Sequence, residues 1–162
     1  MEDGPGSQRA IGRYLLFAEL ASGGMASVHL ARLVGPVGFS RTVAIKRLHP
    51  QLARDPDGVS AFLDEARLTA RVHHPNVVQT LDVVEMPGEL FLVMEYVRGE
   101  TLSRLLRAVA ERGERPPARI VLPIVTGALY GLHAAHEAKN ERGEPLGIVH
   151  RDVSPQNLIV GV

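Results

Sequence analysis

The sequence predicts an α+β protein of two lobes: a five-stranded antiparallel sheet with one helix, followed by a partial helical lobe. Three observations predict this arrangement. Short runs rich in β-branched and apolar residues fill the first half of the chain, as is typical of strands. In the second half the apolar residues form longer stretches of helical character. Between the halves, Arg98 and Gly99 interrupt the pattern, so a linker is expected there.

The first half is expected to form five strands and one helix. Residues 13–20 and 27–34 flank the small-residue segment ASGGMAS and should form a hairpin with a glycine-rich tip. The third strand is RTVAIKRL, and the last two, VVQTLDVVE and ELFLVMEYV, flank the turn MPGE. Residues 57–72 carry apolar side chains at spacings of three and four, which predicts an amphipathic helix between the third and fourth strands.

The second half is expected to form two helices and a final strand. Thr101 is the expected N-cap of a short helix that ends near residue 112. Residues 116–138 are apolar with prolines at their start, which predicts a longer, buried helix. The last run, NLIVGV, is expected to be a strand that lacks its hairpin partner. The expected divisions are therefore a flexible tail at 1–12, a β-rich lobe at 13–97 and an α-rich part at 98–162.

Composition narrows the class of protein. Apolar residues make up 45% of the 162 positions, the usual share for a folded domain. Basic and acidic residues balance at 18 each, which argues against nucleic-acid binding as the main function. The chain has no cysteine, which excludes disulfides and thiolate zinc sites. The apolar run at 120–135 is shorter than the roughly 20 residues of a membrane helix, so we expect no membrane contact from this segment and a cytoplasmic location.

Three short motifs could carry chemistry, and each has an ordinary structural interpretation when taken alone. Lys46 ends VAIK on a strand, where a surface lysine is common. Glu65 is one of several acids on the expected helix, where a solvated face is common. The turn SGGM suits an ordinary hairpin, because glycine adopts positive φ freely, although free backbone N–H groups in such a turn can also bind phosphate.

The order of these features resembles the protein kinase family. A glycine-rich hairpin is followed by VAIK, a helical glutamate, a strand that leads into a linker, and finally HRDVSPQN at residues 150–157. An HRD triplet with asparagine five positions after its aspartate is part of that family's signature. The resemblance covers the chain from about Tyr14 to Val162 and favours the bacterial serine/threonine type.

The resemblance implies a site for ATP and Mg²⁺. Lys46 would contact the α- and β-phosphates and pair with Glu65, Asp152 would accept the proton of the substrate hydroxyl, and Asn157 would hold a magnesium ion. The adenine would lie between Val28 and Ala44, beside the gatekeeper Met94, and bind the backbone of Glu95 and Val97. The phosphate loop would comprise Ala21, Ser22, Gly23 and Gly24.

The chain departs from the family pattern in three places. Alanine stands at the first and third loop glycines, Ala21 and Ala26, which implies weaker ATP binding. Ser154 stands where serine kinases usually carry lysine, so the choice of substrate residue, Ser/Thr or Tyr, stays open. The family's magnesium-binding DFG segment is expected downstream of Val162. We therefore expect a truncated kinase piece with little activity of its own.

Three functions are compatible with these sequence features. The first is a protein serine/threonine kinase with a protein substrate, whose longer parent could dimerise or carry a membrane anchor further along. The second is a pseudokinase or ATP-binding regulatory module, favoured by the altered glycine loop and Ser154 but opposed by Asp152 and Asn157. The third is a small-molecule phosphotransferase of similar fold, which Arg151 opposes because that class commonly has HGD at this point.

Overall fold

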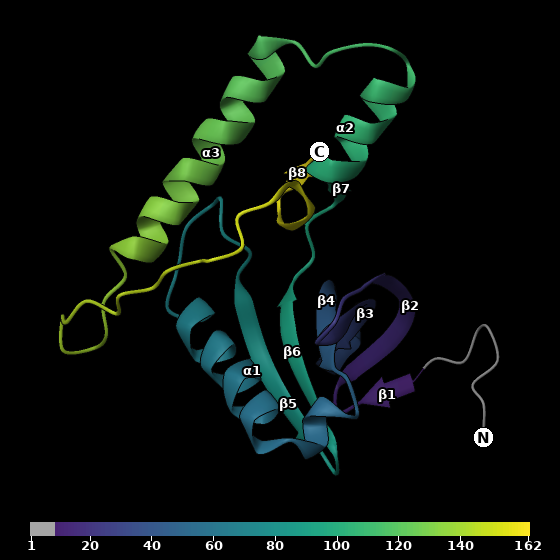
Figure 1. Ribbon diagram of the computed structural model, residues 1–162. Helices are drawn as coiled ribbons and strands as arrows, with labels where there is room; N and C mark the ends of the chain where they lie inside the picture. Colours follow the sequence, from purple (N-terminus) through teal and green to yellow (C-terminus); the bar gives the residue numbers. More distant parts are fainter. Residues whose placement is uncertain (1–8) are drawn as a thin grey trace. The chain divides into compact units, whose positions relative to one another are not determined.

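The computed structural model describes residues 9–162, which form two compact units. The first unit runs to Ala70 and includes Gln79–Tyr96. The second unit comprises Arg71–Val78 and Val97–Val162. Each unit has its own elements and is described by itself below, with the labels of Figure 1.

The first unit is built on a six-stranded antiparallel sheet with the order β1-β2-β3-β4-β6-β5. The sheet therefore has one strand more than the five expected. The additional strand is β1, whose residue Ile11 is fully buried and which pairs with β2, so the expected tail at 1–12 is wrong for Arg9–Ile11. The rest of that tail, residues 1–8, lies outside the described residues. The strands are β1 Arg9–Ile11, β2 Tyr14–Ser22, β3 Ala26–Val34, β4 Ser40–Leu48, β5 Thr80–Met86 and β6 Glu89–Glu95.

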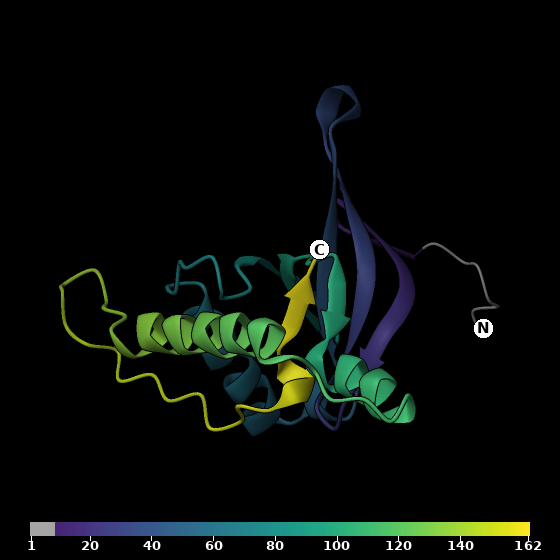
Figure 2. The same cartoon turned by 90° about the horizontal axis from the view of Figure 1, so that it is seen from above.

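Alternating side chains along these strands form two hydrophobic clusters, one on each face of the sheet. One cluster contains Val43, Ile45, Phe91 and Val93 with residues from β1 and β2. The other contains Leu48, Leu90 and Leu92 with side chains of α1. The hairpin of β3 and β4 extends beyond the neighbouring strands (Figure 2).

Helix α1 (Pro56–Thr69) lies along β5 and β6 (Figure 1). Asp55 is its N-cap and accepts a hydrogen bond from the backbone N–H of Asp57, as short polar side chains do at helix starts. The helix ends before the expected residue 72, and a turn leads toward His74 and Pro75. Pro75 disfavours helical dihedrals at His74, but the helix already ends at Thr69, so the proline does not account for its early end.

The second unit contains β7 (Gly99–Thr101), α2 (Leu102–Glu111), α3 (Ala118–His136) and β8 (Ile159–Gly161). The predicted N-cap is confirmed, because the Thr101 side chain accepts a hydrogen bond from the Arg104 N–H. The strand predicted in NLIVGV is present as β8. It was expected to be unpaired for want of a hairpin partner, but it pairs antiparallel with β7, a strand far earlier in the chain (Figure 2). Gly99 permits this pairing, because a Cβ there would lie 2.1 Å from the Val160 carbonyl oxygen.

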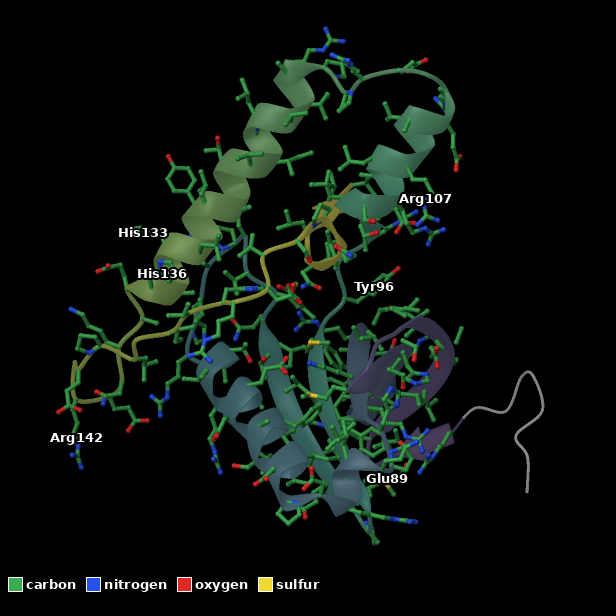
Figure 3. The ribbon with its side chains drawn as sticks, viewed as in Figure 1. Glu89, Tyr96, Arg107, His133, His136 and Arg142 are labelled. Carbon is green, nitrogen blue, oxygen red and sulfur yellow. The ribbon has the colours of Figure 1, made fainter. Side chains whose placement is uncertain are left out.

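Helix α3 is far more exposed than expected. Within it only Gly131 is buried, whereas Leu122, Leu129 and Tyr130 are each at least 60% exposed. Apolar content predicts a tendency to be covered but does not supply the covering segment, which is why the expectation of a buried helix was wrong. By length and composition alone α3 could also cross a membrane, a test that core helices of soluble domains pass as well. His133 and His136 lie on its last turns (Figure 3), and no metal-binding cluster of three acidic or histidine side chains exists among residues 9–162.

Candidate active site

The most specific feature of the first unit is the contact between Lys46 and Glu65. Lys46 lies on β4 and Glu65 on α1, and the lysine Nζ is 2.7 Å from both carboxylate oxygens of Glu65. The ammonium is also 5.7 Å from the centre of the Phe62 ring, a buried aromatic on the same helix. The lysine side chain is only 21% exposed. The pair that the resemblance implies is therefore present, and its charge lies partly out of water.

The strand register places the other expected nucleotide-contacting side chains on the face that carries Lys46. Val28 of β3 lies directly opposite Lys46, and Met94 of β6 lies directly opposite Ala44. Directly paired residues share a face of a sheet, as do residues two apart on one strand. Met94 also packs against the cluster that α1 closes. The result is an apolar surface with one cation beside it, suited to a flat aromatic base and an anion.

The turn between β2 and β3, Ser22–Ala26, is called the glycine-rich turn below. Its Gly23 N–H donates to the Ala26 carbonyl at 2.9 Å, which closes the turn. Among residues 9–162, the N–H groups of Gly24 and Met25 donate to no protein acceptor. Adjacent free N–H groups in a turn form a concave site for an anion. Ala21 precedes the turn on β2 and pairs with Val28.

Glu95 ends β6 and is fixed by Gln79. Its backbone N–H donates to the Gln79 carbonyl at 3.0 Å, and its carboxylate accepts from the Gln79 N–H at 2.8 Å. The backbone N–H of Glu95 is therefore already used. Its backbone carbonyl oxygen is the group that could accept a hydrogen bond from an adenine. Val97 belongs to the second unit, where it lies beside Gly161 of β8.

In the second unit the loop His150–Asn157 joins Asp152 to Asn157. The Asn157 Nδ2 donates to the Asp152 carboxylate at 2.8 Å and to its backbone carbonyl at 3.0 Å. A side-chain amide that donates through nitrogen presents its oxygen elsewhere, and the Asn157 Oδ1 accepts no hydrogen bond from the described residues. The Asp152 N–H in turn contacts His150 Nδ1 at 3.3 Å. A carboxylate and a free amide oxygen therefore lie side by side, and oxygen is the ligand that magnesium prefers.

Three further contacts near the site could not be predicted from the sequence. Ser27 Oγ lies 2.9 Å from His29 Nε2, and burial lowers the pKa of His29 below its ordinary value. Thr69 and Thr80 share a hydrogen bond at 2.8 Å, and His49 contacts the glycine-rich turn. For the His49 contact, the sequence offers one signal: the histidine lies between the end of a predicted strand and a proline.

Comparison with known proteins decides the family. The profile of the family described as "Protein kinase domain" matches residues 14–161. This chain belongs to the protein kinase family. Its two units accordingly form a protein kinase fold with a mostly antiparallel sheet, as expected from the sequence.

Individual kinases support the assignment. The chain is 47% identical over 147 residues to "Tyrosine-protein kinase MasK" of Myxococcus xanthus, covering 91% of this chain and 23% of that protein. It is 37% identical to "Probable serine/threonine-protein kinase pknA2" of Bifidobacterium longum, covering 99% of this chain and 20% of that protein. The crystal structure of the Mycobacterium tuberculosis PknI kinase domain superposes with a TM-score of 0.70 at 30% identity. It covers 99% of this chain, which spans 60% of that domain.

Proposed function

We propose that this chain is the nucleotide-binding part of a bacterial protein serine/threonine kinase, which transfers the γ-phosphoryl group of ATP to a protein hydroxyl. The observation that carries the proposal is the contact of Lys46 Nζ with both carboxylate oxygens of Glu65. That pair holds an ammonium on the sheet face that carries Val28, Ala44 and Met94. Kinases require this pair to hold the phosphates of ATP.

The residues of the loop His150–Asn157 would carry the chemical step. The hydroxyl oxygen of the substrate bonds to the γ-phosphorus, the bond from phosphorus to the β–γ bridging oxygen breaks, and ADP leaves. Asp152 would orient the hydroxyl and accept its proton. Its carboxylate is held by Asn157 at 2.8 Å, which fixes its direction.

Magnesium fits the oxygen atoms present in this loop. When bound, it neutralises the charge that develops on the phosphate oxygens. Asn157 would hold it through Oδ1, which accepts no hydrogen bond from the described residues. Mg²⁺ usually keeps several waters and phosphate oxygens as ligands, so one or two protein oxygens suffice.

A tyrosine hydroxyl is the second candidate acceptor. Ser154 stands where serine kinases usually carry lysine, and the relative at 47% identity bears the name of a tyrosine kinase. A relative named as a serine/threonine kinase matches 99% of the chain. We place the acceptor on a protein in the cytoplasm and assign serine or threonine first.

Nucleotide binding to this chain tests the first half of the proposal. Titration with a fluorescent ATP analogue and Mg²⁺ should show saturable binding, and Lys46→Met should weaken it by at least about tenfold. Arg54→Met removes a positive charge from an exposed residue outside β4 and α1 and should leave affinity unchanged. Equal affinity of the Lys46→Met variant and the unaltered chain would remove Lys46 from the site.

Phosphoryl transfer by the longer protein tests the second half. Asp152→Asn should bind nucleotide normally but lower transfer from labelled ATP by at least about 10²-fold. Hydrolysis of the labelled product to phosphoamino acids then distinguishes serine, threonine and tyrosine. Binding without any transfer by the unaltered longer protein would instead favour the pseudokinase alternative.

A further inference from the structure

The glycine-rich turn is held by one residue from outside it. His49 follows directly after β4, and its ring Nε2 lies 2.8 Å from the Gly23 carbonyl oxygen. Its backbone N–H donates to the Met25 carbonyl oxygen at 3.0 Å. Because a carbonyl oxygen only accepts hydrogen bonds, the ring nitrogen must be the donor in the first contact. One residue thus binds two carbonyl groups on opposite sides of the tip of the turn.

The backbone of His49 is held by hydrogen bonds and by the packing of its neighbours, which limits the positions that its ring can take. Its carbonyl oxygen accepts from the N–H groups of Leu52 and Ala53, each at 2.9 Å. Leu48, just before it, is 1% exposed and belongs to the hydrophobic cluster that includes side chains of α1. Pro50, just after it, restricts the backbone of His49 to extended conformations. The position of the ring is therefore set by packing and hydrogen bonds outside the turn.

The direction of these contacts matters for an anion. Carbonyl oxygens carry partial negative charge and repel phosphate, whereas N–H groups attract it. His49 binds the carbonyls of Gly23 and Met25, while the N–H groups of Gly24 and Met25 have no acceptor among residues 9–162. The Gly23 carbonyl and the Gly24 N–H belong to one planar peptide group and point in opposite directions. The ring contact of His49 with the Gly23 carbonyl therefore turns the Gly24 N–H away from His49.

We propose that His49 is a positioning residue for the triphosphate: it holds the glycine-rich turn in the conformation that presents the Gly24 N–H group. This inference rests on the proposed function. His49 would also hold the turn at a place where the chain departs from the family pattern, because Ala21 and Ala26 replace two of the three glycines.

The test compares three variants of the chain in two measurements. His49→Ala removes the ring contact and keeps the backbone contact. His49→Gln retains a side-chain N–H that can donate to the Gly23 carbonyl. His73→Ala removes an exposed histidine outside the turn and is the matched control. The measurements are amide hydrogen exchange of residues 23–26 by NMR and the dissociation constant for the fluorescent ATP analogue.

For His49→Ala we expect the Gly23 N–H to exchange several-fold faster and nucleotide affinity to fall about fivefold, the effect of one neutral hydrogen bond. His49→Gln should recover most of both effects, and His73→Ala should match the unaltered chain. Faster exchange with unchanged affinity, or no change in either, would overturn the inference. If the unaltered chain fails to bind nucleotide, the proposed function fails, and the exchange rates alone decide whether His49 holds the turn.

Discussion

Thr69 Oγ1 and Thr80 Oγ1 lie 2.8 Å apart and join the last turn of α1 to the start of β5. Thr69 also donates to the Glu65 carbonyl oxygen at 2.8 Å. A hydroxyl has one hydrogen to donate, so the shared bond must use the hydrogen of Thr80. A continuous chain of hydrogen bonds therefore runs from β5 to the backbone of Glu65, whose carboxylate contacts Lys46.

We predict that the two threonines stabilise the first unit as a coupled pair. Thr69→Val and Thr80→Val should each cost about 1 kcal/mol of unfolding free energy, because each leaves a partly buried hydroxyl without its partner. The double variant should cost less than the sum, with a coupling energy of about 0.5–1.5 kcal/mol. Urea unfolding of the four proteins measures it. Strictly additive losses would show that the contact contributes nothing specific.

The candidate site residues came from the resemblance to the kinase family, and local sequence patterns predicted only the elements that carry them. The strand predicted for VAIK and the helix predicted around Glu65 are both present. The Thr101 cap is likewise a local preference for an oxygen-bearing side chain at a helix start. In these cases the physical cause lies within a few residues of the position predicted.

One missed feature is local: strand β1 pairs with the neighbouring β2 but is too short to show alternation. The other missed features depend on residues distant in the sequence. The pairing of β7 with β8 joins Gly99 to Gly161, and no local pattern indicates it. The contact of His49 with Gly23 depends on how β4 ends relative to the β2–β3 hairpin. Such contacts follow from the assembled fold, so periodicity alone could not reveal them.

Glu89 should make the unfolding free energy of the first unit depend on pH in the acidic range. Its carboxylate, at the start of β6, accepts hydrogen bonds from Arg9 and from Arg47, the latter at 2.6 Å; Glu89 is labelled in Figure 3. These contacts, with the Arg9 hydrogen bond foremost, lower the pKa of Glu89 below its ordinary value of 4.5. A carboxyl group with a lowered pKa stabilises the fold above its unfolded pKa, and that contribution is lost as pH falls through the folded pKa.

Thermal unfolding between pH 7 and pH 3 measures this contribution. We expect Glu89→Gln to cost about 1–3 kcal/mol at pH 7 and to lose less stability than the unaltered protein between pH 4.5 and pH 3. Glu85→Gln, on the neighbouring strand β5, is a control that should follow the unaltered profile. Parallel pH profiles for Glu89→Gln and the unaltered protein would contradict the assignment.

Gly99 should tolerate no side chain. A Cβ at this position would lie 2.1 Å from the Val160 carbonyl oxygen and 2.9 Å from the Gly161 Cα, both on the paired strand β8. Gly99→Ala should therefore separate β7 from β8 and cost about 1–3 kcal/mol. The matched control is Gly24→Ala, where a Cβ meets no atom within 4 Å. Hydrogen exchange of the Val162 N–H, which donates to the Arg98 carbonyl, reports on this sheet directly. Unchanged exchange in Gly99→Ala would show that β8 does not need the close approach.

Arg151 has a φ of 62°, in the left-handed region, directly before Asp152. Its side chain makes no hydrogen bond or ion pair with the described residues, so its removal should cost little contact energy. Glycine adopts this conformation without strain, but it also loses more conformational entropy on folding. These effects oppose each other, and Arg151→Gly should stay within about 1 kcal/mol of the unaltered protein.

A β-branched residue resists positive φ, so Arg151→Val should be destabilised by about 1–2 kcal/mol. Val153→Gly, in the same loop at a position without positive φ, should only lose stability. Equal stabilities of Arg151→Gly and Arg151→Val by chemical unfolding would mean that the loop before Asp152 relaxes out of the left-handed conformation.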